Sequence, residues 1–191
     1  MRRLLLIRHG VTEGNEKRWY YGSTDLPLTE AGRSQLLAKK RAGVYPALDG
    51  ARLIVTPLKR TQESAAILFP GAPFEVWPEL REVDCGAFEC RSYEEMKDEP
   101  AYQQWLADDW YATAPPGGES LAAAEVRMRA GLARLLALEG DAAVVCHGGT
   151  IIVFMQALFP AVEKTQYEWQ PKPGEGWEID LAAQTFRPVG A

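Results

Sequence analysis

The sequence has few of the residues that form covalent cross-links or metal sites. It contains three cysteines (Cys85, Cys90 and Cys146) and two histidines in 191 residues. An odd number of cysteines in a chain of this size argues against a disulfide framework. A zinc site is also disfavoured, because the adjacent Cys146 and His147 of an extended segment point to opposite faces. We therefore expect neither disulfides nor a bound metal.

Long apolar runs and an excess of positive charge are missing as well. No stretch approaches the ~20 apolar residues of a membrane span. The run Leu4–Ile7 after Met1-Arg2-Arg3 is too short for a signal peptide, and Arg8 ends it. The net charge of -5 and the pI near 5.2 argue against nucleic-acid or anionic-membrane partners. We expect a cytoplasmic protein without these partners, and the sequence leaves its oligomeric state open, a homodimer included.

Two common catalytic motifs are absent. The chain has no Gly-x-x-x-x-Gly-Lys-Ser/Thr phosphate loop and no Gly-x-Ser-x-Gly nucleophile elbow. Its composition, with 47% hydrophobic and 25% charged residues, is that of an ordinary globular protein. A chain of this length buries roughly 70% of its unfolded surface as one domain. We expect a single domain over residues 1–191.

Apolar runs alternate with segments that carry helix signals. Buried strands are expected at Leu4–Ile7, Leu53–Val55 and Ala142–Cys146, and further strands at Phe74–Trp77, Tyr167–Gln170, Trp177–Leu181 and Thr185–Val189. Helices are expected from Glu30 to about Ala42 with Thr29 as N-cap, after Ser120, and over Ile151–Phe159. In the helix after Ser120, Leu121, Met128, Leu132 and Leu135 form an apolar stripe that we assign to the core.

The helix expected after the second strand breaks a local rule. Thr56 is predicted as its N-cap and Pro57 as its first residue, which places Lys59 at the third position and Arg60 after it. Cations there face the positive end of the helix dipole, which is unfavourable. Helix amide groups and a guanidinium together attract anions, so we interpret Arg60 as part of a site. A solvated surface pair is the alternative, and it suits Lys59 better.

Aromatic residues crowd the segment between Ser92 and Pro116. Ser92 and Glu95 form a capping-box pattern that opens a short helix. The aromatic residues that follow are Tyr102, Trp105, Trp110 and Tyr111. They either pack this segment on the core or form a helical cover whose rings stack on a ligand. We take residues 84–118 or so as an inserted substrate cover.

Three strand ends carry similar chemistry. His9 and His147 each end an apolar strand and precede a glycine, and Arg60 lies just beyond the second strand. Because the carboxyl ends of parallel strands share one edge of a sheet, these side chains can converge there. Two histidines, Arg8, Arg60 and a glycine-led helix N-terminus best suit a phosphoryl group.

Five segments, in the same order, resemble the histidine phosphatase superfamily, also called phosphoglycerate-mutase-like. They are Arg8-His9-Gly10 with Thr12 and Asn15, Gly22–Gly32, Thr56–Ala65, Leu80-Arg81-Glu82 with Gly86, and His147-Gly148-Gly149. The resemblance implies a three-layer α/β/α sandwich with a mostly parallel central sheet and a small helical cover over the active site. It also implies an enzyme that needs no cofactor.

The resemblance implies a role for each matching position. His9 would attack phosphorus to form a phosphohistidine, and Glu82 would protonate the leaving oxygen and later activate water. Arg8, Arg60 and His147 would hold the phosphoryl oxygens. The other expected substrate-binding residues are Thr12, Asn15, Tyr21, Gly22, Ser23 and Gly148. We also expect the second ring nitrogen of His9 to donate to a backbone carbonyl, which keeps the imidazole neutral.

The predicted function is hydrolysis of a small-molecule phosphate ester without a metal. Weaker motifs are similar to those of the alpha-ribazole phosphatases of cobalamin assembly: Tyr20-Tyr21-Gly22, Tyr102–Trp105, Pro116–Glu119 and Gly176–Asp180. A cofactor-dependent phosphoglycerate mutase is the alternative enzyme, although mutases carry additional segments around the site. A phosphate-binding protein without catalysis is the alternative of a different class.

Overall fold

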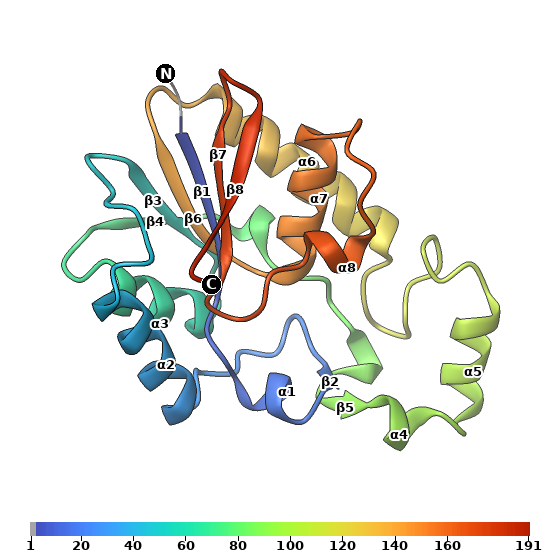
Figure 1. The fold of residues 1–191 in the computed structure, drawn as a ribbon. Coiled ribbons are helices and arrows are strands. Elements are labelled where there is room, and N and C mark those ends of the chain that lie inside the picture. The colour runs from blue at the N-terminus through green and yellow to red at the C-terminus, as the bar shows by residue number, and fades with distance from the viewer. Residues whose placement is uncertain (1–2) are drawn as a thin grey trace.

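The computed structural model describes residues 3–191, so Met1 and Arg2, considered above as the start of a signal peptide, lie outside the described residues. A six-stranded sheet with the order β4-β3-β6-β1-β7-β8 forms its centre (Figure 1). The strands are β1 (Arg3–Arg8), β3 (Arg52–Val55), β4 (Phe74–Val76), β6 (Ala142–Cys146), β7 (Gly176–Asp180) and β8 (Thr185–Val189). The first four are mutually parallel and the C-terminal hairpin is antiparallel, which confirms a mostly parallel sheet.

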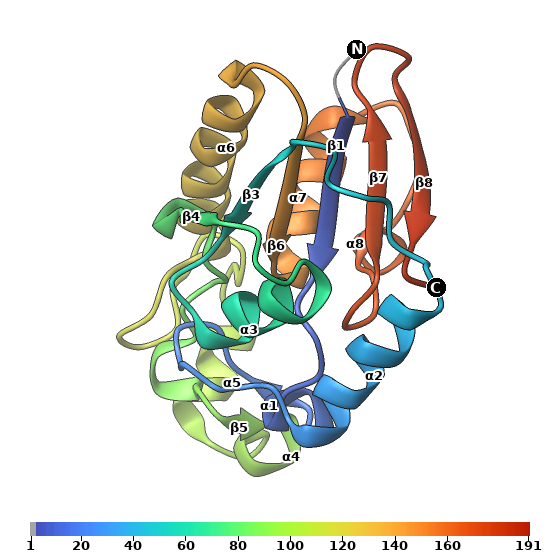
Figure 2. The same cartoon turned by 90° about the vertical axis from the view of Figure 1, so that its left-hand side faces the viewer.

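Helices cover both faces of the sheet, as the turned view in Figure 2 shows. One face carries α6 (Leu121–Ala137) and α7 (Gly148–Leu158), and the other carries α2 (Glu30–Arg41) and α3 (Lys59–Leu68). Strand β1 is buried on both sides because alternate residues point to alternate faces. Leu4 and Leu6 pack in the core beneath α6 and α7, whereas Leu5 and Ile7 pack beneath α2 and α3.

Two helix starts confirm the sequence analysis. Thr29 caps α2 by accepting a hydrogen bond from the Gly32 amide, and Ser120 caps α6 by accepting one from the Ala123 amide. The stripe on α6 is confirmed for three residues. Leu121 is the exception: it is only partly buried and lines cavities, so its assignment to the core was wrong.

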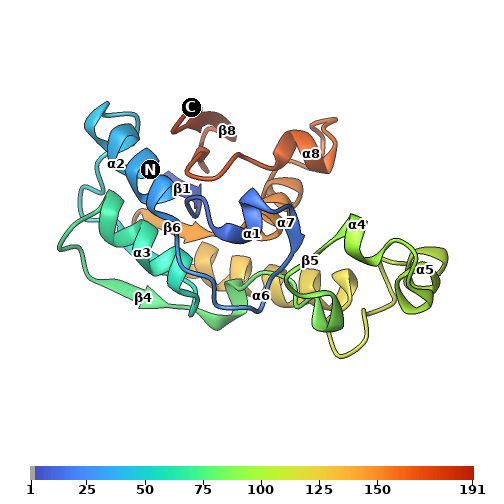
Figure 3. The same ribbon diagram turned by 90° about the horizontal axis from the view of Figure 1, so that it is seen from below.

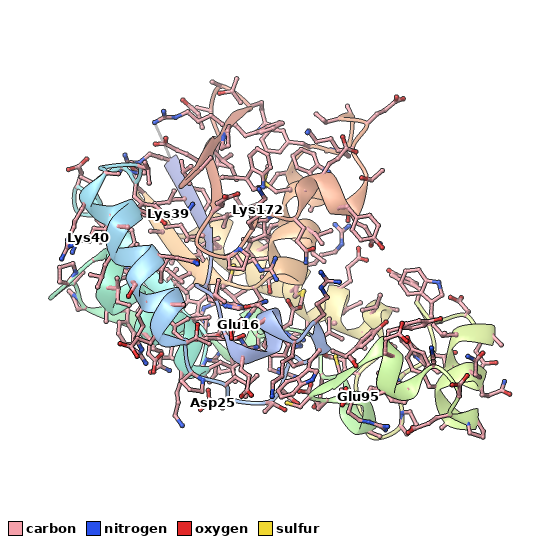
Figure 4. The ribbon with its side chains drawn as sticks, turned by 60° about the horizontal axis from the view of Figure 1, so that its bottom comes forward. Glu16, Asp25, Lys39, Lys40, Glu95 and Lys172 are labelled. Atoms are coloured by element: carbon pink, nitrogen blue, oxygen red, sulfur yellow. The ribbon has the colours of Figure 1, made fainter. Side chains whose placement is uncertain are left out.

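The predicted start of the helix after β3 was wrong. Helix α3 begins at Lys59 with Leu58 as N-cap, so Pro57 precedes the helix. The Thr56 hydroxyl does not cap it, because it lies 3.0 Å from both Thr61 Oγ1 and His147 Nε2. Asp25 performs that function instead: its carboxylate accepts from the Lys59 amide at 2.7 Å. Figure 4 labels Asp25 at the lower edge of the molecule in that view.

Two further boundaries differ from the prediction. Helix α7 starts at Gly148 instead of Ile151, directly after β6. The expected strand Tyr167–Gln170 is a short helix, α8 (Gln166–Trp169), capped by Thr165 and Glu168 in a capping box. That Thr-x-x-Glu pattern is visible in the sequence, but the aromatic residues with high strand propensity concealed it.

A smaller lobe projects beyond the carboxyl ends of the parallel strands, as Figure 3 shows from below. In this lobe, strand β2 (Trp19–Tyr20) pairs with β5 (Arg91–Ser92). The lobe also contains the helices α1 (Glu13–Glu16), α4 (Tyr93–Met96) and α5 (Pro100–Ala107). Two 3₁₀ turns connect it to the sheet: η1 (Pro78–Leu80) and η2 (Gly86–Phe88). Phe88, Met96 and Tyr102 form its own small core. Over residues 3–191, no helix has the length and apolarity to cross a membrane.

Candidate active site

The two histidines lie side by side at the carboxyl ends of neighbouring parallel strands. His9 follows β1 and His147 follows β6, and their ring centroids are 5.3 Å apart. Both side chains are buried. The structure therefore brings these two strand ends together, as the sequence analysis expected. Arg60, in the first turn of α3, lies at the same edge of the sheet.

A backbone contact fixes the tautomer of His9. Its Nδ1 lies 2.7 Å from the Gly10 carbonyl oxygen, which can only accept, so Nδ1 carries the proton and Nε2 keeps its lone pair. Burial, reinforced by the charges of Arg60 and Arg8, lowers the pKa of His9 well below its usual 6.5. The imidazole is thus neutral at physiological pH and has a nucleophilic nitrogen available.

Arg60 is held by backbone carbonyls of the loop that follows β2. Its Nη1 donates to Thr24 at 2.8 Å and its Nη2 to Gly22 at 2.7 Å, while the Tyr21 ring lies 5.0 Å from the guanidinium carbon. The side chain is fully buried, and burial lowers its pKa. A buried cation held by neutral carbonyls keeps most of its charge for a ligand.

Three buried nitrogen atoms of the site have no hydrogen-bond partner among the described residues. They are Arg8 Nε, Arg60 Nε and His147 Nδ1. Arg8 is held through Nη1, which donates to the Pro171 carbonyl at 2.9 Å. Burial, followed by the charge of Arg60, lowers the pKa of His147 well below 6.5. Unpaired buried polar groups are costly, so these three nitrogens are available to a ligand that supplies hydrogen-bond acceptors.

Glu82 lies in the loop after η1, and its side chain is part of the same site. Its two carboxyl oxygens accept from the amides of Val83 at 3.0 Å and Gly149 at 2.9 Å. Gly149 leaves little room, since a Cβ there would lie 2.4 Å from Glu82 Oε1. The first turn of α7 thereby holds the carboxyl group, whose charge raises the pKa values of Arg8 and Arg60 against the larger effect of burial.

The residues predicted to bind substrate divide into two groups. Arg8, Asn15, Tyr21 and Glu82 line a cavity of about 870 Å³, which we call the strand-end cavity. Its other lining residues are Gly14, Arg18, Trp19, Tyr20, Val83, Cys85, Tyr93, Leu121, Gly149, Tyr167 and Gln170. Gly148 begins α7, and a Cβ there would lie 2.4 Å from Gln170 Nε2.

Thr12, Gly22 and Ser23 are not among the residues that line the strand-end cavity. The Thr12 hydroxyl lies 2.7 Å from the Tyr21 hydroxyl and donates to Asn15 at 3.1 Å. The Ser23 hydroxyl donates to Asp84 at 2.9 Å. Gly22 must be glycine, because a Cβ would lie 1.6 Å from the Val83 carbonyl oxygen. The hydroxyls of Thr12 and Ser23 are thus used within the protein. The buried side chains of His9, Arg60 and His147 are likewise not among the residues that line the strand-end cavity.

The sequence analysis missed three residues of this region. Gln170 lines the strand-end cavity beside Gly148. Glu89 accepts hydrogen bonds from the amides of Gly22, Ser23, Thr24 and Cys85 and from the Thr24 hydroxyl. Arg127 contacts the backbone that carries Glu82. Nothing local in the sequence distinguishes these three from solvated polar residues, because their partners are remote along the chain.

A second cavity of about 400 Å³ adjoins the first, and we call it the aromatic cavity. The two share Tyr20, Val83, Cys85, Leu121 and Tyr167. The other lining residues of the aromatic cavity are Asp84, Phe88, Trp105, Leu106, Trp110, Pro115, Glu119 and Gln166. Tyr102 is fully buried in the lobe, which confirms a packing role for this residue, whereas Trp105 and Trp110 line a cavity, and ligand stacking by their rings stays a prediction.

The region combines a neutral imidazole, two arginines, a second histidine and a carboxyl group, a set of side chains suited to phosphoryl chemistry. Within residues 3–191, no group of three or more His, Cys, Asp or Glu side chains is placed to hold a metal ion. A family model described as histidine phosphatase superfamily (branch 1) matches residues 4–187, and the chain belongs to this superfamily. It is an enzyme of the phosphatase class.

Relatives of this chain have two kinds of names. The adenosylcobalamin/alpha-ribazole phosphatase of Salmonella typhimurium is 28% identical over 185 residues, 94% of this chain and 90% of that protein. The probable phosphoglycerate mutase GpmB of Enterobacter sp. is 31% identical over 202 residues, 95% of this chain and 93% of that protein. The crystal structure of the alpha-ribazole phosphatase of Shigella flexneri has a TM-score of 0.85 at 25% identity and covers 99% of this chain and 96% of its own.

Proposed function

We propose that this protein hydrolyses a small phosphate monoester through a phosphohistidine intermediate, without a metal or other cofactor. The observation that carries the proposal is the set of unpaired buried nitrogens on Arg8, Arg60 and His147 beside the neutral imidazole of His9. A phosphoryl group supplies several acceptor oxygens and negative charge at one point, which satisfies all three donors at once.

In the first step, His9 Nε2 forms a bond to phosphorus while the bond from phosphorus to the leaving oxygen breaks. Glu82, in its protonated form, gives its proton to that oxygen, and the alcohol departs. Arg8 and Arg60 balance the charge on the phosphoryl oxygens. His147 is neutral because its pKa is lowered by burial and by the arginines, so it contributes a hydrogen bond instead of a charge.

In the second step, water replaces His9 on phosphorus. The Glu82 carboxylate takes a proton from the attacking water, the bond between His9 Nε2 and phosphorus breaks, and inorganic phosphate leaves. His9 returns to its neutral form with Nδ1 still donating to Gly10. Both steps use residues of this chain alone, which is the basis for the absence of a metal in the proposal.

The substrate we propose has a ring in its leaving group, and alpha-ribazole phosphate is the specific candidate. The aromatic cavity, lined by Trp105, Trp110 and Phe88, adjoins the strand-end cavity that Glu82 lines, and it offers space for the leaving group. Indole and phenyl faces stack on planar heterocycles. The relatives from Salmonella and Shigella that are named for alpha-ribazole support the same choice.

The reaction is tested with 4-nitrophenyl phosphate in the presence of EDTA, comparing the wild type with His9→Ala. We expect hydrolysis by the wild type and a loss of at least about 1,000-fold in the variant, as for removal of a nucleophile. Equal rates for the two proteins would exclude catalysis by His9. Complete inhibition by EDTA would exclude the metal-independent mechanism.

The substrate is tested with a panel of phosphate esters that includes alpha-ribazole phosphate, glycerol phosphate and phosphoglycerate. We expect the largest kcat/KM for alpha-ribazole phosphate. A rate no better than that for glycerol phosphate would exclude this substrate. The Enterobacter relative named as a mutase makes interconversion of phosphoglycerates the competing activity. Strong interconversion with negligible hydrolysis would assign the chain to that reaction instead.

A further inference from the structure

The backbone that carries Glu82 is held by side chains from two helices. From α7, the Thr150 hydroxyl donates to the Leu80 carbonyl at 3.0 Å. From α6, Arg127 donates to the carbonyls of Glu79 and Arg81 through Nη1, both at 2.9 Å, and to that of Glu82 through Nη2 at 3.3 Å. Every carbonyl oxygen from residue 79 to residue 82 thus accepts from one of two side chains.

Arg127 uses all of its hydrogen-bonding capacity in this position. A guanidinium has five N–H groups in a rigid fork. Three of them donate to the carbonyls of the loop, and the other two donate to Glu119, from Nε at 3.0 Å and from Nη2 at 2.6 Å. The side chains of Arg127 and Glu119 are both only 15% exposed. Lysine has three donors on a flexible stem and cannot reproduce this pattern.

Glu119 connects its ion pair with Arg127 to the substrate cover. Its amide donates to the Asp84 carbonyl at 2.9 Å, and its side chain lines the aromatic cavity. Arg127 is therefore bound at once to the backbone just before Glu82 and to a residue that is tied to the backbone just after it. The bidentate pair fixes the distance between the carboxyl group and the leaving-group side of the site.

We infer that Arg127, supported by Glu119, is a positioning residue for the general acid. It touches neither substrate nor reacting atoms: it holds the Glu82 backbone so that the carboxyl group meets the leaving oxygen. This inference rests on the proposed function, because it assigns a task to Arg127 within that reaction. It predicts that loss of the Arg127 guanidinium weakens proton donation by Glu82 and leaves attack by His9 intact.

Esters with different leaving groups distinguish weaker proton donation by Glu82 from weaker attack by His9. An alkyl leaving group such as that of glycerol phosphate depends on protonation, whereas 4-nitrophenolate leaves without it. The parameter to measure is kcat/KM, since it ends at the first irreversible step, transfer of the phosphoryl group to His9. Arg127→Lys is expected to lower kcat/KM about tenfold for glycerol phosphate and less than about threefold for 4-nitrophenyl phosphate, because a positioned general acid contributes 10²–10⁴.

Two further variants keep the test decisive if Arg127→Lys folds poorly. Glu119→Gln retains Arg127 and weakens only its bidentate partner, and the same selective loss is expected. Arg129→Lys is the matched control, because Arg129 lies on the same helix in an exposed ion pair with Glu125. It should change neither ester's kcat/KM by more than about twofold, in line with the small contribution of exposed pairs.

A double-mutant cycle completes the experiment. In a Glu82→Gln background the general acid is gone, so Arg127→Lys should have less than a twofold further effect on glycerol phosphate. An equal loss on both esters, or full additivity with Glu82→Gln, would overturn the inference while the hydrolysis itself stands. A wild type that hydrolyses neither ester would overturn the proposed function and this inference together.

Discussion

His9 and His147 are neutral because the site that contains them is both buried and positively charged. Burial is the larger cause of the lowered pKa values, and Arg60 and Arg8 add to it. The unfolded chain has no such constraint, so both imidazoles bind protons there near pH 6.5. The unfolded state therefore takes up protons that the folded state refuses, and acid must destabilise the fold.

This contrast predicts how stability depends on pH. The contribution of the histidines is fully present above pH 6.5 and is lost as the pH falls from 6.5 toward the folded pKa values. The free energy of unfolding should fall by up to about 1.4 kcal/mol per pH unit for each histidine. Urea titrations at pH 7.5, 6.5 and 5.5 measure it. The chain has only two histidines, so imidazole NMR provides a check. An imidazole of the folded protein that titrates near 6.5 would contradict the prediction.

Because Gly149 has no side chain, it leaves space for the Glu82 carboxyl group, and a larger residue at this position would occupy that space. In Gly149→Ala the new Cβ would lie 2.4 Å from Glu82 Oε1, a flexible side-chain end that can shift. We expect an unchanged or higher Tm, because alanine favours a helix, and a loss of kcat/KM of about tenfold or more for alkyl phosphates. Thermal melts and kinetics measure the two.

Gly148→Ala is the matched control for this variant. Its Cβ would meet Gln170 Nε2 at 2.4 Å and not Glu82. The loss in Gly148→Ala should therefore be similar for esters with good and with poor leaving groups, whereas the loss in Gly149→Ala should grow as the leaving group becomes poorer. The same dependence on the leaving group in both variants would refute the role of Gly149.

At the scale of elements, Glu89 ties the substrate cover to the loop that follows β2. Its carboxylate accepts from the backbone of Gly22 and Thr24, whose carbonyls hold Arg60. Burial alone would raise the pKa of Glu89, but the hydrogen bonds from Thr24 and three neighbouring amides outweigh it and the pKa is lowered. The lobe is thus part of the site even where it does not touch substrate.

The prediction for Glu89 concerns stability and phosphate binding together. Glu89→Gln replaces one acceptor oxygen with a donor and should cost about 1–3 kcal/mol in the free energy of unfolding. Because the carbonyls around Arg60 also shift, we expect inorganic phosphate to inhibit less well, with Ki raised several-fold. Glu94→Gln on the same segment is the control, since Glu94 is exposed and paired only with Lys97. Weakening of the control to the same degree would contradict the prediction.

Trp110 provides a test of the cover as a binding surface. It is 45% exposed and lines the aromatic cavity, whereas the neighbouring Tyr111 is 43% exposed and does not. Trp110→Ala should raise KM for a ring-bearing phosphate ester about threefold to tenfold, since an aromatic pair contributes 0.5–1.5 kcal/mol. KM for glycerol phosphate should not change. Tyr111→Ala is the matched control variant. An equal rise in KM in Tyr111→Ala would show that the ring of the substrate does not stack on Trp110.

Strands and helix caps were largely predictable because their causes are local. Apolar runs identified β1, β3, β4 and β6, and Thr29 and Ser120 capped the helices that follow them. The start of α3 was not predictable, since it is fixed by Asp25 from a remote loop and by the use of the Thr56 hydroxyl beside His147. Local signals cannot show a competition between distant partners.

The site was predictable to the extent that its residues end strands. His9, His147 and Arg60 converge because parallel strands deliver their ends to one edge. Arg127 on α6 and Gln170, which follows α8, were missed because a solvated arginine or glutamine at either place has the same local sequence signal. Thr12 and Ser23 had the residue type of a ligand contact, but their hydroxyls are used within the protein.

The position of β1 in the middle of the sheet has a consequence for the order in which the molecule is built. Leu4 pairs with Ala142 on one side and with Ile179 on the other. During synthesis β1 is made well before its two neighbours in the sheet, β6 and β7. Until β7 emerges, β1 lacks a partner along one edge, and Arg8 lacks the Pro171 carbonyl that holds it. Arg8 and His9 are thus made long before the strands that flank β1, and the site forms only after β6 and β7 have been made.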